Sequence, residues 1–224
     1  MATQQQVSIR RLTNPTLQEH QRVLAILLGA FAGDVEIAAM TGGKASLEPA
    51  FFRLQFELSL TYGEVYVAGT GGSIDAVALI FAPGQDFVVD ENTNFQPSHD
   101  FVSKLTPEMQ QWWIMHLRPK FAELTNISLG SAEARKAAYY IRIIAAHPEK
   151  QRRGLARKLM ETFMQKADGG KKKMCLETST DAMVRVFYKF GFKVRGTKNF
   201  GSALGGFPLF CMVREPRPAL AVAN

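Results

Sequence analysis

Residues 151–156 carry the pattern that points most directly to chemistry, since they read Gln-Arg-Arg-Gly-Leu-Ala. An apolar, strand-like run at 141–146 precedes them, and a helix-like pattern of apolar residues follows at 155–167. A strand, a short turn with a glycine and the start of a helix leave several backbone N–H groups without partners and pointing the same way. Such a nest binds an anion, usually a phosphate. The sequence therefore predicts a phosphorylated cofactor at this turn.

Two common phosphate-binding motifs do not fit these residues. A Walker A loop needs two glycines with Lys and Ser or Thr at fixed positions, and Gly154 stands without them. A dinucleotide-binding fingerprint needs three glycines after a first strand, and this turn supplies one. The identity of the cofactor therefore depends on a second motif.

A second block, residues 188–192, reads Tyr-Lys-Phe-Gly-Phe. Together the two blocks resemble the signature of the GNAT superfamily of acetyl-CoA-dependent N-acetyltransferases. That signature has Gln-x-x-Gly-x-Ala after a strand and, further along, Tyr-x-x-Gly-Phe. The strong resemblance covers residues 138–195, and the first half of the chain matches only in its order of elements. The resemblance implies acetyl-CoA as co-substrate and no metal ion.

The resemblance also implies where the coenzyme binds. Backbone N–H groups of residues 152–157 would surround the pyrophosphate at the positive end of a helix dipole, and Gly154, without a Cβ, would let the phosphate come close. In this family the strand before the turn separates from its neighbour, and pantetheine docks on the freed backbone. The expected coenzyme-binding residues are Ile144, Ala145, Ala146, Arg152, Arg153, Gly154, Leu155, Ala156 and Arg157.

Tyr188 is, by the same resemblance, the residue that donates a proton to the departing thiolate of coenzyme A. We place it in the first turns of a helix that Ser179 or Thr180 caps. An alternative interpretation is that Tyr188 packs against Val184, one helical turn earlier.

The general base is less clearly marked, because the strand before the glycine turn offers two tyrosines and Arg142 but no carboxylate. An alkyl ammonium has a pKa of about 10.4, so a base must remove a proton before the amine can attack. Glu177, at the end of the next strand, is the nearest acidic candidate, and its alternative role is a salt bridge at the strand end. His147 and His116 are weaker candidates.

The net charge of +7 is unevenly distributed, since residues 142–200 hold 15 Lys and Arg against 5 Asp and Glu. Either this basic surface only keeps the protein soluble, or it attracts an anionic ligand. We expect no nucleic-acid binding, because no stacking aromatic residues are interleaved with the basic ones. Cys175 and Cys211 lie in apolar runs and are expected to be buried free thiols.

Apolar spacing and turn residues predict the elements that position these residues. The predicted strands are 7–12, 64–68, 74–81, 139–146, 174–177, one that begins at 192–194, and 207–213. The predicted helices are 15–31, 47–60, 107–116, 119–124, 155–167 and 180–190. The last helix is expected to bury Met183, Val186, Phe187 and Phe190. Residues 198–201, together with Gly205 and Gly206, are expected to form a flexible loop, which in this family often meets the acceptor.

The order β-α-β-α-β with short connections, together with the resemblance, predicts an α/β fold. We expect a mixed, mainly antiparallel, twisted sheet of about six or seven strands flanked by helices. Residues 1–215 would form a single N-acetyltransferase domain with a helical insertion at about 86–136, and residues 216–224 a loose tail. The N-terminus lacks the apolar core of a signal peptide, and the longest aliphatic run is too short to span a bilayer, so we expect a cytoplasmic protein without membrane contact.

The expected function is acetyl transfer from acetyl-CoA to a primary amine of a small molecule, by direct attack in a ternary complex. Aromatic residues at 51–56 and at 112–113 suggest an apolar or aromatic amine, although they also suit a packed core. Two alternatives remain open: a protein or peptide N-acetyltransferase, and an acetyl-CoA-binding module without catalysis. Relatives commonly form dimers, so a homodimer is compatible with the resemblance.

Overall fold

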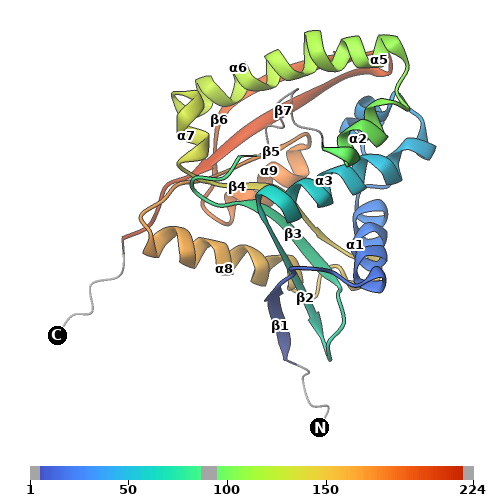
Figure 1. Cartoon of the computed structure of the whole chain (residues 1–224). Coiled ribbons are helices and arrows are strands. Elements are labelled where there is room, and N and C mark those ends of the chain that lie inside the picture. The colour runs from blue at the N-terminus through green and yellow to red at the C-terminus, as the bar shows by residue number, and fades with distance from the viewer. Residues whose placement is uncertain (1–5, 87–94, 219–224) are drawn as a thin grey trace, which may run out of the picture.

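The computed structural model describes residues 6–86 and 95–218, which form a sheet and the helices packed around it (Figure 1). The strands are β1 (Val7–Arg11), β2 (Glu64–Thr70), β3 (Ala76–Phe81), β4 (Tyr139–Ala146), β5 (Met174–Thr178), β6 (Lys193–Ser202) and β7 (Gly205–Arg214). The helices are α1 (Leu17–Ala30), α2 (Val35–Thr41), η1 (Ala45–Leu47), α3 (Glu48–Tyr62), α4 (Gln96–Val102), α5 (Pro107–Trp112), η2 (Trp113–Leu117), α6 (Arg118–Leu129), α7 (Ala132–Lys136), η3 (Pro148–Lys150), α8 (Leu155–Gly169) and α9 (Asp181–Tyr188).

The strands form one seven-stranded sheet in the order β1-β2-β3-β4-β5-β7-β6 within the described residues. Every neighbouring pair is antiparallel except β4 and β5, which run parallel. The predicted fold class and the mainly antiparallel sheet are therefore confirmed. A parallel pair needs a long crossover, and α8 supplies the one between β4 and β5.

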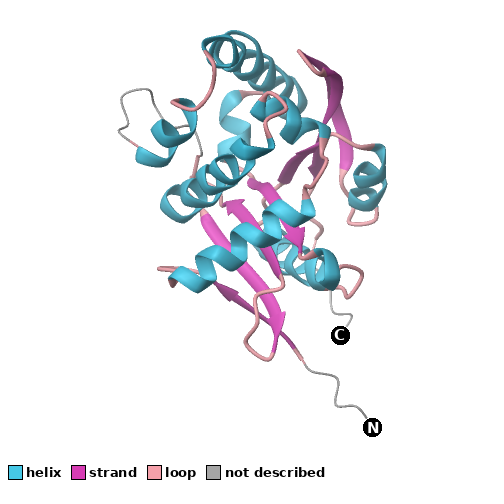
Figure 2. Cartoon of the chain, turned by 90° about the vertical axis from the view of Figure 1, so that its right-hand side faces the viewer, coloured by secondary structure: helices cyan, strands magenta, loops and turns pink. Residues whose placement is uncertain are grey.

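Helices cover both faces of the sheet, as the two views show (Figures 1 and 2). Alternate side chains of β3 point to opposite faces: Val77 and Leu79 pack toward α1 and α3, whereas Ala78 packs toward α8. On α8, Leu159 and Phe163 are fully buried against this second face, as the helical spacing predicts. Burial of each such side chain contributes about 1.5–3 kcal/mol to stability.

The segment 96–136 packs mainly at the β6 edge of the sheet, opposite β1. Helices α5 and α6 are joined through the π-helical turn η2, and the resulting rod runs along the ribbon formed by β6 and β7 (Figure 1). A Cβ at Gly196 of β6 would lie 2.3 Å from Ser128 Oγ of α6, so glycine allows the close approach of helix and strand. This segment falls within the expected helical insertion, of which residues 87–94 lie outside the described residues.

The prediction of a flexible loop at 198–206 is wrong. Residues 193–202 and 205–214 form two long strands that stay paired to the tip, where Ser202 faces Gly205 and only two residues turn the chain. The rings of Phe200 and Phe207 stack at 5.6 Å and hold the ribbon together near that tip. Trp112 Nε1 also donates a hydrogen bond to the carbonyl of Gly201 at 2.8 Å.

The expected buried face of α9 is also partly wrong. Phe187 and Val184 are buried, but Met183 and Val186 keep 37% and 40% of their surface exposed. Val184 and Phe187 lie three residues apart and share one face, whereas Met183 and Val186 lie beside that face. Thr180 caps the helix by accepting a hydrogen bond from the N–H of Met183, as predicted.

The expected loose tail begins in contact with α8. The backbone N–H of Arg217 donates a hydrogen bond to Asp168 Oδ1 at 2.7 Å, and the buried Arg214 forms an ion pair with the same carboxylate. Residues 219–224 of that tail lie outside the described residues. In the part of the chain described, no single helix is both long enough and apolar enough to cross a bilayer. Helices α1 and α2 would be long and apolar enough only if counted together, and they are bent relative to each other by 114°.

Candidate active site

The parting of β4 and β5 opens the sheet next to the predicted coenzyme site. The two strands pair only at their beginnings, through Tyr139 with Met174 and Tyr140 with Cys175. Beyond this point, β4 stays paired with β3 up to Ala146, but no strand of the described residues pairs with its other edge. Residues 144–146, expected to bind pantetheine, lie on this open edge. Backbone groups on such an edge are available to a ligand, although the carbonyl of Ala146 accepts a 3.4 Å hydrogen bond from Gln151 Nε2.

A bulge in β4 lies at the same level. Leu79 of β3 faces Ile143, whereas the next residue, Ile80, faces Ile141, so Arg142 is an extra residue in β4. Such a bulge changes the direction of the side chains around it. Arg142 thereby reaches α3, where its Nε donates a hydrogen bond to Gln55 Oε1 at 2.8 Å.

The turn from β4 into α8 forms a nest of backbone N–H groups. Arg152 and Gly154 both adopt left-handed backbone conformations, with φ of 62° and 80°. The first helical bond runs from the N–H of Lys158 to the carbonyl of Gly154 at 2.9 Å. Among the described residues, no acceptor is found for the backbone N–H groups of 152–157. Donors without partners at a helix N-terminus attract negative charge.

The surroundings of the nest leave room for an anion. Apart from Gly154 itself, its chain neighbours and the adjoining helix backbone, no atom of the described chain lies within 4 Å of the position of a Cβ at Gly154. The side chains of Arg152 and Arg153 are exposed, and no ion pair of either is found in the described residues. Arg157 lies 3.9 Å from Glu161, measured from Nε to Oε1. Leu155 is buried in the core, so only its backbone can face a ligand.

Tyr188 is the last residue of α9, not a residue of its first turns as we expected. Half of its surface, 51%, is exposed, whereas Val184 one turn earlier is buried. The ring is therefore not enclosed by packing against Val184. Its phenol is accessible, which a proton donor to a bound ligand requires.

Both carboxylate oxygens of Glu177 are buried, within reach of the Tyr140 hydroxyl and the Cys211 thiol. Burial raises the pKa of this carboxyl above its ordinary value of 4.5, although the nearby hydroxyl of Tyr140 and guanidinium of Arg142 act in the opposite direction. No ion pair of Glu177 is found in the described residues, so the salt bridge considered as its alternative role is not seen there. A buried carboxyl with a raised pKa is a candidate for acid–base chemistry.

Sequence reasoning missed the polar groups that surround Glu177. Gln55 of α3 is buried among aromatic residues, and Arg142 bridges it to the buried hydroxyl of Tyr140 through a 3.3 Å hydrogen bond from Nη1. Burial raises the pKa of the Tyr140 phenol. Glu36, in the first turn of α2, lies near enough to Arg142 and Glu177 to interact with their charges. The polar Gln55 within an otherwise apolar helix was the available signal.

The two histidines considered as bases have a buried ring nitrogen without a partner among the described residues, Nε2 in His116 and Nδ1 in His147. His116 stacks on Trp112 with the ring centroids 6.0 Å apart. No contact of either ring with Tyr188 or Glu177 is found in the described part of the chain. The two cysteines are buried free thiols, as expected, and burial raises their pKa values.

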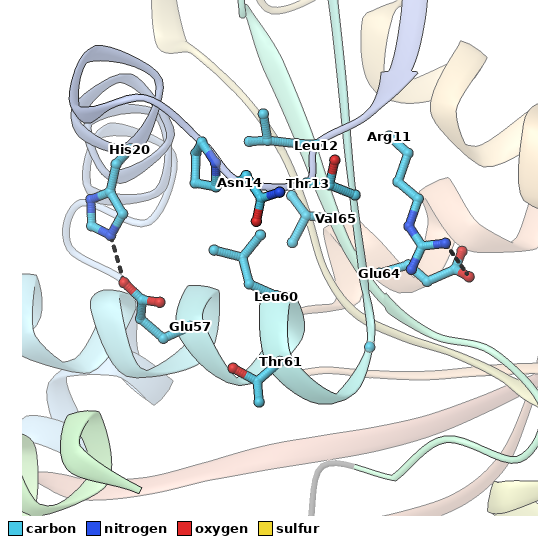
Figure 3. A pocket seen from close by; sticks show the side chains of 12 residues that line it. Arg11, Leu12, Thr13, Asn14, His20, Glu57, Leu60, Thr61, Glu64 and Val65 are labelled. Atoms are coloured by element: carbon cyan, nitrogen blue, oxygen red, sulfur yellow. Dashed lines mark hydrogen bonds and ion pairs between the residues drawn. The ribbon is translucent and has the colours of Figure 1, made fainter.

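A separate cavity of about 590 Å³ lies at the β1 edge of the sheet (Figure 3). His20 Nε2 and Glu57 Oε1 are 2.8 Å apart on one side of it, and Arg11 and Glu64 form an ion pair of 3.4 Å on the other. Its lining comes from β1, the turn after it, α1, α3 and the start of β2, with no residue of β4, β5, α8 or α9. It is therefore distinct from the opening between β4 and β5. In the described residues, no group of three or more His, Cys, Asp and Glu side chains could hold a metal ion.

Comparisons with known proteins show similarity to acetyltransferases in sequence and in fold. Residues 102–208 match the family of acetyltransferase (GNAT) domains. A structure from Corynebacterium glutamicum, described as histone acetyltransferase HPA2 and related acetyltransferase, has a TM-score of 0.60 and 17% identity over 96% of this chain and 99% of its own.

Two insect enzymes are similar in fold as well. For arylalkylamine N-acetyltransferase 2 from Aedes aegypti the TM-score is 0.58 at 18% identity, over 94% of this chain and 99% of that one. For the polyamine N-acetyltransferase of Drosophila melanogaster the TM-score is 0.58 at 16% identity, over 94% and 100%. No curated protein sequence matches the chain.

Proposed function

This chain belongs to the GNAT superfamily and is an acyltransferase, and from that membership we propose that it transfers the acetyl group of acetyl-CoA to a primary amine of a small molecule. The family uses acetyl-CoA as co-substrate. In this chain, the position of the nest supports acetyl-CoA as the co-substrate. Its unpaired N–H groups at 152–157 directly follow the strand edge that β5 leaves open.

In the proposed complex, the pyrophosphate of the coenzyme binds the N–H groups of 152–157, with added charge from Arg152, Arg153 and Arg157. Pantetheine binds the open edge at Ile144, Ala145 and Ala146. A backbone N–H of that edge donates to the carbonyl oxygen of the thioester, which becomes negative as the amine attacks. The backbone of Leu155 and Ala156 completes the nest.

The proposed reaction is a direct transfer in a ternary complex. Glu177 accepts a proton from the ammonium of the acceptor, because its raised pKa makes it a stronger base than an exposed carboxylate. The neutral nitrogen attacks the thioester carbon, so that the N–C bond forms and the C–S bond breaks. Tyr188 donates its proton to the departing thiolate, and the proton on the new amide nitrogen goes to solvent.

Small-molecule amines are the acceptor class that the relatives favour. Structures with the same fold include enzymes named for arylalkylamines, polyamines and agmatine. The rod of α5, η2 and α6 brings Trp112 and Trp113 to the same end of the molecule as α2, where Trp113 Nε1 donates to the carbonyl of Met40. We propose that these rings limit the acceptor to compact or aromatic amines.

A protein acceptor is the second candidate, because the structure from Corynebacterium glutamicum is described as related to a histone acetyltransferase. A peptide substrate needs an open groove, and in this chain α6 packs along the ribbon of β6 and β7, which Trp112 of α5 also contacts. We therefore place a protein acceptor second. An inactive module that only binds acetyl-CoA is the third candidate. A cytoplasmic location and a homodimer stay predictions.

A thermal-shift titration with acetyl-CoA, coenzyme A and NADPH tests the coenzyme site. A ligand at 100 times its Kd stabilises the folded state by about 2.7 kcal/mol. We expect both coenzyme A species to raise the melting temperature and NADPH to leave it unchanged. If neither coenzyme A species shifts the melting temperature, residues 151–156 form only a structural turn and not a coenzyme site.

Thiol release then separates the three candidates. Release of coenzyme A with arylalkylamines or diamines, but not with lysine-containing peptides, supports the proposed acceptor class. Release with peptides alone would reverse the order of the first two candidates. Binding of acetyl-CoA without thiol release from any amine or peptide would leave the inactive module.

A further inference from the structure

The cavity at the β1 edge of the sheet has walls that secondary structure holds in place. Its volume of about 590 Å³ lies within the range of about 300–1,000 Å³ that is usual for small-molecule sites. The N–H of Leu12 donates to the carbonyl of Val65 at 2.8 Å, which continues the pairing of β1 with β2 beyond Arg11. Thr16 then caps α1 with a capping box. The turn at 13–15 is therefore fixed at both ends.

Two charged pairs stand on opposite sides of this cavity (Figure 3). His20 and Glu57 are hydrogen-bonded on one side, whereas Arg11 and Glu64 on the other form an ion pair of 3.4 Å. The lining carries a formal charge of −1 with a neutral imidazole and of zero with an imidazolium. Its charge therefore favours a cation over an anion. The floor between the two pairs is apolar and comes from Leu12, Leu60 and Val65.

Glu57 has one carboxylate oxygen to offer a ligand. Its Oε1 lies 2.8 Å from His20 Nε2, and no partner of its Oε2 is found in the described residues. The Glu57 side chain is 26% exposed, so a ligand in the cavity can reach it. Thr61 follows one helical turn later on the same face of α3, and in Figure 3 its hydroxyl points to the side of Glu57. A carboxylate and a hydroxyl that lie next to each other suit a group with several N–H donors.

Asn14 adds a polar group from the opposite wall. Its φ of 44° is a left-handed conformation, which asparagine adopts more readily than most residues with a Cβ, although at some cost. Its side chain lies over Leu60, and no hydrogen bond of its amide is found in the described part of the chain. Strained backbone conformations are common where a protein contacts a ligand.

We propose that this cavity binds a small organic cation, a primary ammonium that carries an apolar body, at a site separate from the opening between β4 and β5. The ammonium donates to Glu57 Oε2 and to the hydroxyl of Thr61, and the apolar body packs on the floor of the cavity. An anion would meet the carboxylates of Glu57 and Glu64 at either side. No residue of the nest and neither candidate catalytic residue lines the cavity, so this site does not depend on the proposed function.

The experiment is an NMR titration of protein labelled in its leucine and valine methyl groups, without coenzyme. The probe is hexylamine, because an alkyl ammonium with a pKa of about 10.4 is charged at pH 7. We expect it to shift the methyl signals of Leu12, Leu60 and Val65, which report on the cavity itself. The isosteric probes 1-hexanol and hexanoate should need at least about tenfold higher concentrations, since neither can form the charge-assisted bond to Glu57.

Glu57→Gln keeps the size of the side chain and removes its charge. We expect this variant to raise the Kd for hexylamine at least about tenfold, because a charge-assisted hydrogen bond becomes a neutral one. Thr61→Val should raise it about threefold. The matched control Glu48→Gln removes the same charge from the same helix outside the cavity lining and should bind like the wild type. Unchanged methyl signals of Leu159, in the core under α8, would show that each variant is folded.

Wild-type affinity in Glu57→Gln would overturn the proposal, as would hexanol binding as tightly as hexylamine. Tighter binding of hexanoate would make the cavity an anion site at Arg11 and would also refute it. Shifts confined to methyl groups away from the cavity would mean that the amine binds elsewhere, with the same consequence. Thiol release from acetyl-CoA is measured separately, and its absence would refute the proposed function while this site stands.

Discussion

The burial of the Glu177 carboxyl has two effects: it lowers the stability of the folded protein, and it supports the proposed role of Glu177 as a base. A buried carboxylate costs stability, because its charge has lost contact with water and the Tyr140 hydroxyl and Arg142 guanidinium compensate for this loss only in part. The same surroundings raise its pKa and make it a better proton acceptor. Replacing a buried charged group with an apolar one of similar volume is often neutral or stabilising. The proposed catalytic role therefore explains a residue that packing does not.

Replacing Glu177 with Gln is expected to stabilise the protein at alkaline pH while it lowers the rate of transfer. The pKa of Glu177 is raised in the folded state, so between 4.5 and that raised value the folded protein holds a proton that the unfolded chain releases. The carboxyl therefore lowers the free energy of unfolding as the pH rises through this interval. Urea unfolding at pH 5 and pH 8 should show a gain for Glu177→Gln at pH 8 and a smaller change at pH 5.

Glu133→Gln is the control for this measurement, because that side chain is 79% exposed and its removal should change stability little at either pH. Equal stability of Glu177→Gln and wild type at pH 8 would mean that the carboxylate has partners in solution.

Replacing Tyr188 with Phe tests the proposed proton donor. A general acid contributes about 10²–10⁴-fold to the rate, so kcat should fall by at least about 10²-fold while the Kd for acetyl-CoA stays the same. Steady-state kinetics with coenzyme titration separates the two effects. Tyr139→Phe, at the start of β4, removes a phenol for which no hydrogen bond is found in the described residues and should leave kcat unchanged. An unchanged kcat in Tyr188→Phe would remove Tyr188 from the mechanism.

At the scale of elements, the turn between β4 and α8 depends on backbone geometry more than on side chains. The left-handed conformation of Gly154 is one that residues with a Cβ adopt only with strain. A methyl group added at Gly154 would not collide with other parts of the described chain. An alanine at this position therefore tests two things: the strain of the left-handed conformation, and the space above the nest.

We expect Gly154→Ala to lower the free energy of unfolding by about 1–2 kcal/mol and to weaken acetyl-CoA binding. The added methyl group would project into the space proposed for the pyrophosphate. Thermal unfolding and coenzyme titration measure the two effects. Gly169→Ala, at the end of α8, also has open space at its Cβ but no positive φ, and should change neither quantity by as much. Wild-type affinity in Gly154→Ala would mean that the phosphates bind elsewhere.

The elements defined by short-range patterns were predictable from the sequence. Strand β4, the turn at 151–154 and helix α8 were found because apolar spacing and one glycine determine them locally. Both strands of the ribbon were predicted in part, but its end at 198–206 was mistaken for a loop because its glycines suggest flexibility. Contacts with α6, which come from a distant part of the chain, make that segment a paired ribbon.

The polar cluster was not predictable in the same way. Glu36 lies in a helix of seven residues that the sequence analysis missed, and a helix of that length shows little periodicity. Gln55 and Arg142 are hydrogen-bonded although 87 positions separate them in the chain. Only the arrangement of α2 and α3 over the sheet brings these side chains together with Glu177. The candidate base was named from the sequence, but its surroundings were not.

At the scale of the whole molecule, positive charge gathers in the half that contains the nest. Residues 142–200 hold 15 Lys and Arg against 5 Asp and Glu, and the described ion pairs neutralise only some of them. Such a field increases the local concentration of an anionic ligand.

The Kd for acetyl-CoA should therefore rise several-fold when ionic strength increases from about 0.05 M to about 0.5 M, because salt screens exposed charges. Binding of S-acetylpantetheine, which lacks the nucleotide phosphates, should respond much less. Calorimetric titrations at several salt concentrations compare the two ligands. Equal salt dependence for both would mean that the basic residues serve solubility and not coenzyme binding.

The short ladder between β4 and β5 divides the sheet into two leaves. Strands β1 to β4 form one leaf and strands β5 to β7 the other, and in the described residues the strand pairing between them is limited to Tyr139 with Met174 and Tyr140 with Cys175. A coenzyme lying along the open edge of β4 would bridge the two leaves. Since a ligand of the native state suppresses unfolding, the empty enzyme would be the form most open to proteases. The lifetime of this protein in a cell would then follow the supply of its own co-substrate.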